Sequence, residues 1–191
     1  MLKSYFQNIL NEVGCDEVGR GCIAGPVVAA AVILPKNYLN AEIKDSKMLS
    51  MNKRKILDIE IKKNAIDWSI GIVSNKLIDK INILNASILA IQKALNKLKT
   101  KPSFIIVDGN KFKPYKDISY KCIIKGDNKY LSIASASIIA KNYRDNLMIN
   151  LSKKYNMYSW ETNFGYPTLK HKNGIISKGI SKYHRKSFKL I

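Results

Sequence analysis

The chain has 191 residues, of which 46% are hydrophobic, and carries a formal net charge of +19, from 33 lysines and arginines against 14 aspartates and glutamates. This length is typical of one domain with a real hydrophobic core. No apolar run reaches the roughly 18 residues that a membrane-spanning helix needs, so we expect no membrane partner.

The basic excess favours a polyanionic partner, and nucleic acid is the usual one. General compositional drift is an alternative source of the charge, because lysine, asparagine and isoleucine are abundant together. Acidic residues are scarce, yet Asp16 and Glu17 are adjacent in the least charged part of the chain. This contrast makes the acidic pair the first candidate for a functional site.

The N-terminus and the cysteines indicate the cellular compartment of the protein. Residues 1–11 do not resemble a signal peptide, because polar residues interrupt the apolar ones. We therefore expect a cytoplasmic protein. The three cysteines are an odd number without metal-ligand spacing, which indicates small core or near-site residues in a reducing compartment. They are Cys15, Cys22 and Cys122.

The first predicted strand carries Asp16 and Glu17 and precedes a Gly19-Arg20-Gly21 turn. Neighbouring side chains of a regular strand point to opposite faces. We therefore expect the two carboxylates to share a site only if the strand ends or bulges there. The two glycines favour such a break, since glycine accepts backbone conformations that other residues avoid. A charged hairpin tip is the alternative interpretation.

The next elements alternate between strand-like and helix-like patterns. Runs of β-branched residues indicate strands, and apolar residues three and four apart indicate helices. Ser50 is a good N-cap for the first helix, and the last long helix begins with many small residues that permit close packing on a sheet. This order predicts an α/β fold with a mixed sheet flanked by helices. The predicted strands cover residues 27–34, 67–74, 104–107 and 120–124, and the predicted helices cover residues 51–63, 75–82, 84–98 and 131–153.

Residues 155–191 interleave aromatic and basic side chains. They form either a short helical appendage packed on the core or a nucleic-acid clamp in which aromatic rings stack on bases or sugars. No linker, repeat or low-complexity segment precedes them. We therefore predict one domain, residues 1–191, with a C-terminal helical, substrate-binding appendage at about residues 155–191.

Acidic residues stand at three predicted element ends. Besides Asp16 and Glu17, Asp108 follows the strand at residues 104–107, and Asp127 precedes the last long helix. Asp108-Gly109 is also a common turn dipeptide, which is the alternative for that position. Clustered carboxylates repel one another, and divalent cations, which prefer oxygen ligands, would remove the repulsion. Two such ions ~3.5–4 Å apart can clamp the attacking and leaving oxygens of a phosphodiester.

With these motifs in place, the sequence resembles ribonuclease HII, the bacterial type 2 ribonuclease H. The resemblance covers about residues 14–188, nearly the whole chain. The stretches that carry it are Asp16-Glu17-Val18-Gly19-Arg20-Gly21, Asp45-Ser46-Lys47, Val107-Asp108-Gly109-Asn110, Lys125-Gly126-Asp127 and Gly165-Tyr166, with residues 24–31, 78–79, 82–83, 132–134, 136–138, 140–141, 144–145, 184–185 and 187–188.

The resemblance implies a ribonuclease H-like fold and a metal-dependent endonuclease. The expected reaction is hydrolysis of the RNA strand of RNA–DNA hybrids and cutting 5′ of ribonucleotides embedded in duplex DNA, leaving 5′-phosphate and 3′-hydroxyl ends. The implied partners are these nucleic acids, and we expect a monomer. Two ions of Mg²⁺ or Mn²⁺ are implied as cofactors. Their implied ligands, which are also the catalytic residues, are Asp16, Glu17, Asp108 and Asp127.

The resemblance also implies substrate-binding residues. The turn formed by Gly19, Arg20 and Gly21 would read the ribose 2′-hydroxyl, and Tyr166 would pack on the adjacent sugar. Ser46 and Lys47 lie near the family's phosphate contacts. The chain departs from the family pattern in three places. Cys22 replaces a usual proline, Asn163-Phe164 replace a common His-Lys pair, and Lys182-Tyr183 precede His184.

Two other functions remain possible from the sequence. A different nuclease of the same fold, such as a resolvase, has no use for a reader of the 2′-hydroxyl. A protein that coats nucleic acid without cutting it would need only the charge and the aromatic residues. Such a protein gives no reason for four carboxylates where phosphates must approach. A divalent-ion requirement for turnover separates cutting from coating.

Overall fold

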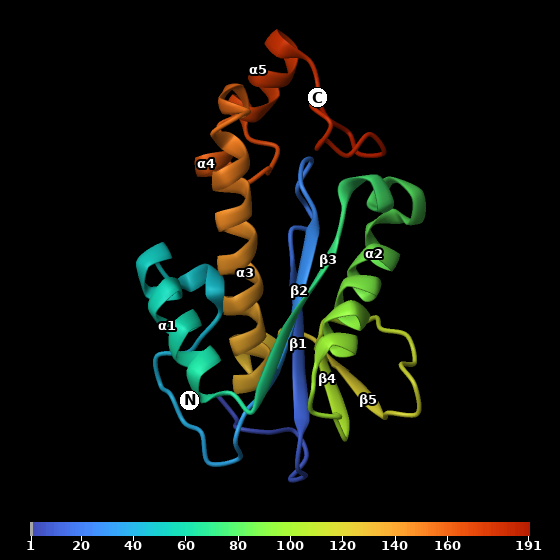
Figure 1. Cartoon of the computed structure of the whole chain (residues 1–191). Coiled ribbons are helices and arrows are strands. Elements are labelled where there is room, and N and C mark those ends of the chain that lie inside the picture. Colours follow the sequence, from blue (N-terminus) through green and yellow to red (C-terminus); the bar gives the residue numbers. More distant parts are fainter. Residues whose placement is uncertain (1) are drawn as a thin grey trace.

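Five strands form a mixed sheet in the order β3-β2-β1-β4-β5 in the computed structural model, which describes residues 2–191 (Figure 1). β1, β2 and β3 pair antiparallel, while β4 runs parallel to β1 and β5 parallel to β4. The prediction of an α/β fold with a mixed sheet is confirmed. The strands are β1 (Glu12–Val18), β2 (Val27–Ile33), β3 (Asp67–Val73), β4 (Phe104–Asp108) and β5 (Tyr120–Ile123).

Helices cover both faces of the sheet, with α2 on one face and α3 and α1 on the other (Figure 1). Ser50 caps α1 as predicted, because its side chain accepts a hydrogen bond from the Lys53 amide. α2 breaks at Asn82, whose φ is 62°, close to the predicted boundary between two helices. The helices are α1 (Met51–Asn64), α2 (Asn75–Lys97), α3 (Leu131–Ser152), α4 (Trp160–Asn163) and α5 (Leu169–Lys178), with short 3₁₀ turns at Ser46–Met48, Gly126–Asn128 and Asn156–Tyr158.

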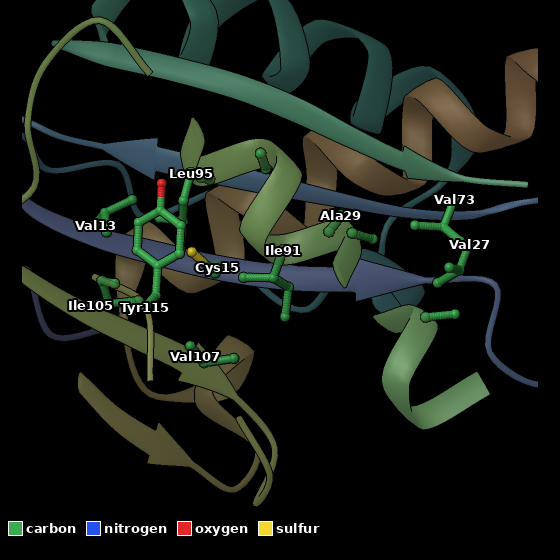
Figure 2. Close-up of a cluster of buried hydrophobic side chains, with 14 of the residues drawn as sticks. Val13, Cys15, Val27, Ala29, Val73, Ile91, Leu95, Ile105, Val107 and Tyr115 are labelled. Atoms are coloured by element: carbon green, nitrogen blue, oxygen red, sulfur yellow. The ribbon is translucent and has the colours of Figure 1, made fainter. Parts of the chain in front are cut away.

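The two hydrophobic cores follow the alternation of β1. Val13 and Cys15 face α2 and belong to a cluster of buried side chains that also includes Val27, Ala29 and Ile91 (Figure 2). The even-numbered residues of the strand face α3. Small residues let α3 approach closely, since a Cβ on Gly14 would lie 2.5 Å from Ser132 Oγ. None of the helices in the described part of the chain is both long and apolar enough to span a bilayer.

The expectation that β1 ends or bulges at its acidic pair is wrong. Asp16 pairs with Ala30 and Glu17 with Ala29 in regular antiparallel register, and the strand continues to Val18. The two side chains therefore point to opposite faces of the sheet. They can still line one pocket because both lie within three residues of the C-terminal end of β1, and the pocket lies at that end of the strand.

The C-terminal region packs on one end of α3 and on the residues that follow the Gly19-Arg20-Gly21 turn. Its aromatic rings pack mainly on one another, with Tyr158 and Trp160 stacked at a centroid distance of 5.0 Å. Both rings are buried, as are the rings of His171 and His184. For these residues the structure supports the packed appendage. Tyr166 differs, because 38% of its surface is exposed.

Candidate active site

A pocket of about 530 Å³ lies where β1 and β4 end and α3 begins. All ten residues that the sequence analysis named as site residues line it. Val18, Arg54, Ser137 and Lys141 complete the lining. The ten predicted residues are Asp16, Glu17, Gly19, Arg20, Gly21, Ser46, Lys47, Asp108, Asp127 and Tyr166.

A larger hollow of about 880 Å³ lies between α2 and the C-terminal segment. Its one acidic residue, Asp79, is engaged by the Ser187 hydroxyl at 2.7 Å and by the Lys186 and Ser187 amides. These bonds anchor the C-terminal segment to α2. The larger hollow therefore lacks the carboxylate cluster that distinguishes the smaller pocket.

Asp16 lies on the α3 face of β1, against Ser137. Its Oδ1 accepts a hydrogen bond of 2.7 Å from the Glu17 amide. Burial raises the pKa of Asp16 well above its usual range, and the negative charges of Glu17 and Asp108 raise it further. A carboxylate in this environment is poorly compensated by the protein alone.

Glu17 lies on the α2 face of the same strand. Its Oε1 forms an ion pair of 3.1 Å with the Arg20 guanidinium, whose side chain is half exposed. Burial raises the pKa of Glu17, while the Arg20 charge and hydrogen bond oppose the increase. The turn after β1 thus supplies the nearest cation to the acidic pair.

Asp108 and Asp127 come from the other side of the pocket. Asp108 ends β4, and its Oδ1 accepts a hydrogen bond of 2.7 Å from the Gly126 amide. Asp127 follows in the 3₁₀ turn directly before α3, so this bond holds the two carboxylates near each other. Burial raises the pKa of Asp127, and the charge of Asp108 raises it further.

The donor set suits a hard divalent cation, because it consists of carboxylate oxygens. The raised pKa values of Asp16, Glu17 and Asp127 also indicate that burial and mutual repulsion outweigh the nearby positive charges of Arg20 and Lys47. Within residues 2–191, however, no three acidic, histidine or cysteine side chains converge tightly enough to surround one ion. Instead, one oxygen of each of the four carboxylates accepts a hydrogen bond from a protein donor. The four carboxylates therefore fit a divalent metal by the chemistry of their oxygen donors.

The two glycines of the Gly19-Arg20-Gly21 turn have different surroundings, and only Gly19 is required by the backbone and by packing. Gly19 has φ +95°, and a Cβ there would overlap Arg144, lying only 2.8 Å from its Cδ. A Cβ on Gly21 would lie 3.7 Å from Cε1 of Tyr166, so this glycine faces the tyrosine ring. The turn is thus packed tightly from beneath and open on the side of the pocket.

Ser46 and Lys47 differ in their ability to bind a substrate phosphate. Ser46 is buried, and its hydroxyl lies 2.9 Å from the hydroxyl of Ser137. It therefore fixes the loop before α1 onto α3. Lys47 lies near Asp127 and lowers the pKa of that carboxyl, partly opposing the effect of burial. Its ammonium group is the better candidate for a phosphate.

The sequence analysis did not place Arg54, Ser137 or Lys141 in the site. Lys141 pairs with Asp145, one helical turn later, at 2.8 Å, and its Nζ lies 4.8 Å from the centroid of the Phe164 ring. Arg54 pairs with the other oxygen of Asp145 at 3.2 Å. The four-residue spacing of Ser137 and Lys141, on one face of α3, was the available signal.

Comparison with known proteins identifies the family, because the family model described as Ribonuclease HII matches residues 13–191. This chain belongs to the ribonuclease HII family. The ribonuclease HII of Bacteroides fragilis is 52% identical over 191 residues, which cover 100% of this chain and 95% of that protein. The resemblance inferred from the sequence motifs is confirmed.

Two solved structures show the same fold. The ribonuclease H2 of Pyrococcus horikoshii superimposes with a TM-score of 0.80 at 26% identity, covering 94% of each chain. The RNase HII in a PCNA:RNase HII complex from Archaeoglobus fulgidus gives a TM-score of 0.76 at 27% identity, covering 92% of each chain. The ribonuclease H-like fold is therefore confirmed. As a ribonuclease HII, the chain is a divalent-metal-dependent hydrolase of RNA paired to DNA, which excludes a protein that only coats nucleic acid.

Proposed function

We propose that this enzyme cuts on the 5′ side of ribonucleotides embedded in duplex DNA, in addition to hydrolysing the RNA strand of RNA–DNA hybrids. One observation carries the proposal. The glycine turn that ends at Gly21 faces the exposed ring of Tyr166 in the same pocket that holds the four carboxylates. A ribose held between the turn and the ring would place its phosphodiester beside the acidic residues.

Asp16, Glu17, Asp108 and Asp127 would hold two divalent ions, Mg²⁺ or Mn²⁺. When bound, the two ions supply activation of a water and stabilisation of the leaving 3′ oxygen, which gives 5′-phosphate and 3′-hydroxyl ends. The chain itself contributes four carboxylate ligands on three separate elements. Backbone amides hold Asp16 and Asp108, and the side chains of Arg20 and Asn128 hold Glu17 and Asp127. Their repulsion in the metal-free protein supports this role.

The substrate would be read by the turn and by Tyr166. The 2′-hydroxyl distinguishes a ribonucleotide from a deoxyribonucleotide at a given position. Backbone groups of Gly19-Arg20-Gly21 can approach that hydroxyl closely because no side chain stands at either glycine. Tyr166 offers a flat ring to the neighbouring sugar. Lys47 and Lys141 lie in the same pocket and supply positive charge for the phosphates.

The remaining features support a nucleic-acid enzyme that acts alone. The net charge of +19 favours binding of a polyanion over many phosphates. We also propose that the enzyme acts as a monomer, because all ten predicted site residues already line one pocket without a contribution from a second copy. All three cysteines are free and two of them are buried, which is consistent with a protein that works in the reducing cytoplasm.

The test is cleavage of a DNA duplex that contains one ribonucleotide, with and without Mg²⁺ or Mn²⁺. We expect metal-dependent cutting on the 5′ side of the ribonucleotide and no cutting of the matched all-DNA duplex. An RNA–DNA hybrid of the same sequence serves as the control for the family activity. If the hybrid is cut while the single embedded ribonucleotide remains intact, the proposal is wrong although the family assignment stands.

A further inference from the structure

Two arginines are fully buried beside the Gly19-Arg20-Gly21 turn. Arg144 of α3 and Arg185 of the C-terminal segment both have 0% of their surface exposed. Within the described residues neither forms an ion pair with a carboxylate. Burial lowers the pKa of Arg185 to about 10, which still leaves it charged at neutral pH. Buried charges without a charged partner are costly, so their retention calls for a specific role.

The Arg185 side chain donates hydrogen bonds to backbone carbonyls, two of which belong to the turn, and it lies over the Phe188 ring. Its Nη2 donates to Gly19 O at 2.7 Å, and its Nη1 donates to Arg20 O at 3.0 Å. Its Nε donates to Gly25 O at 3.0 Å, and Nη2 also donates to Pro26 O at 3.2 Å. One side chain thus holds both the turn and the start of β2.

Arg144 acts on the neighbouring carbonyls in the same way. Its Nε donates to Pro26 O at 3.0 Å, its Nη1 to Phe164 O at 2.7 Å and its Nη2 to Ala24 O at 3.0 Å. Phe164 lies two residues before Tyr166. The same guanidinium fills the space beneath Gly19 that a Cβ would need. Arg144 therefore joins the turn to the segment that carries the exposed tyrosine.

The orientation of the turn's amides follows from these bonds. In a trans peptide the C=O and the following N–H point in opposite directions, and no cis peptide occurs in the described residues. Because Gly19 O and Arg20 O point inward to Arg185, the amides of Arg20 and Gly21 point outward. Neither amide has an acceptor within residues 2–191. Two successive free donors of this kind suit an oxygen-rich ligand.

We propose that Arg185 is a positioning residue for ribose recognition, which turns the Arg20 and Gly21 amides toward the pocket as a preformed pair of donors. The pair serves the 2′-hydroxyl and the adjacent phosphate of the scissile ribonucleotide, so the inference rests on the proposed function. Arg144 is the second positioning residue and sets the tyrosine segment against the turn. Neither arginine touches the substrate.

Only arginine meets the geometric demand at position 185. Its planar fork presents five donors in fixed directions, whereas a lysine ammonium is a point charge with three. Four carbonyls must be satisfied at once. Its own backbone is fixed as well, since the Arg185 amide donates to Ile23 O at 2.8 Å and Asp79 holds the next two amides. The guanidinium is therefore held rigidly enough to position the turn.

The test compares Arg185→Lys with Lys186→Ala, which removes an exposed charge one residue away. The measurements are the cleavage rate of a duplex with one ribonucleotide and the affinity for the matched all-DNA duplex. We expect Arg185→Lys to lower kcat/KM at least tenfold and to change all-DNA affinity less than twofold. Lys186→Ala should leave the cleavage rate within twofold. Equal losses of cleavage and all-DNA affinity in Arg185→Lys would indicate a merely structural role and overturn the proposal.

A second measurement needs no change at Arg185. In the Asp108→Asn protein, which should leave the duplex uncut, hydrogen exchange of the Arg20 and Gly21 amides is followed. We expect fast exchange in the free protein and protection when a ribonucleotide-containing duplex binds, but not when an all-DNA duplex binds. Amides already protected in the free protein, or equal protection by both duplexes, would refute the inference. If the wild-type enzyme leaves embedded ribonucleotides uncut, the proposed function itself fails, and this outcome is distinct from the others.

Discussion

The amide of Gly126 donates a hydrogen bond of 2.7 Å to Oδ1 of Asp108, which joins the end of β4 to the turn before α3. The bond spans 18 positions of the chain. It places Asp127 beside Asp108 although the two acids belong to different elements. The carboxylate cluster is thus held by backbone geometry that survives the removal of a charge.

Asp108→Asn should nearly abolish cleavage and leave the fold intact. The amide oxygen of asparagine can still accept the Gly126 hydrogen bond, while the charge that would bind metal is lost. We expect the same of Asp16→Asn. Cleavage assays at saturating Mg²⁺, together with circular dichroism, check both variants. Substantial cleavage by either would contradict the assignment of that carboxylate as a metal ligand.

Asp16→Asn should also stabilise the metal-free protein at neutral pH. Because the pKa of Asp16 is raised by burial and by neighbouring carboxylates, the native state holds the proton more tightly than the unfolded chain. The stability from this group is present below the ordinary pKa of 3.8 and is lost as pH rises through the raised value. For a chain of this size, a gain of about 1 kcal/mol raises Tm by about 2–4 °C. Thermal melts in EDTA at pH 7.5 measure the effect, and a lower Tm in the variant would refute it.

Because of the buried pair His171 and His184, the free energy of unfolding should decrease as the pH is lowered. Trp160 Nε1 donates to His171 Nε2 at 2.9 Å, and the Ser181 amide donates to His184 Nδ1 at 2.9 Å. Burial and the neighbouring His171 lower the pKa of His184 from 6.5 to about 4, and burial also lowers the pKa of His171. The two neutral histidines make their full contribution to the free energy of unfolding above about pH 6.5, and this contribution is lost as the pH falls toward 4.

The measurement is the free energy of unfolding between pH 4 and pH 7 for the wild type and for His184→Gln. Acidic residues with raised pKa values act in the opposite direction, so the difference between the two proteins isolates the histidine. We expect the wild type to lose more stability on acidification than the variant. Parallel curves would exclude the histidine as the source of the acid sensitivity.

Tyr166→Ala should slow cleavage of a single embedded ribonucleotide about tenfold or more. Stacking on a ring contributes roughly 1–3 kcal/mol per base in single-strand binders, and about 1.4 kcal/mol corresponds to a factor of ten. Tyr166→Phe should lose far less, because the ring is kept. If both variants lose the same cleavage rate, the hydroxyl group and not the ring is responsible for the effect. If neither variant loses cleavage rate, Tyr166 does not belong to the site, and the altered Asn163-Phe164 context is the reason.

Binding to duplex substrate should weaken steeply with salt. If the basic surface neutralises about 5 phosphates, the slope of log K against log salt concentration should be about −4 to −5. Titrations with the Asp108→Asn protein measure binding without cleavage. A slope near zero would mean that the charge of +19 is compositional and takes no part in binding.

Local sequence determined most of the elements and the chemistry of the site. The β-branched runs gave β2 and β4, Ser50 marked the start of α1, and the acids at element ends all reached one pocket. These inferences succeed because strand periodicity, capping and the position of a carboxylate at an element end depend on neighbours in the chain. The family motifs then predicted ribonuclease H activity, which the family assignment supports, and a set of site residues that all line one pocket.

Only the tertiary structure decided how the site is held. β1 stays regular through Asp16 and Glu17 because β2 pairs with it residue for residue, which no local pattern reveals. Arg185 lies 166 positions from the Gly19 carbonyl that it binds. Arginine is usually exposed, so a sequence gives no reason to place one in the interior. Its burial depends on carbonyls from segments that meet only in the folded chain, and that long-range convergence orients the turn.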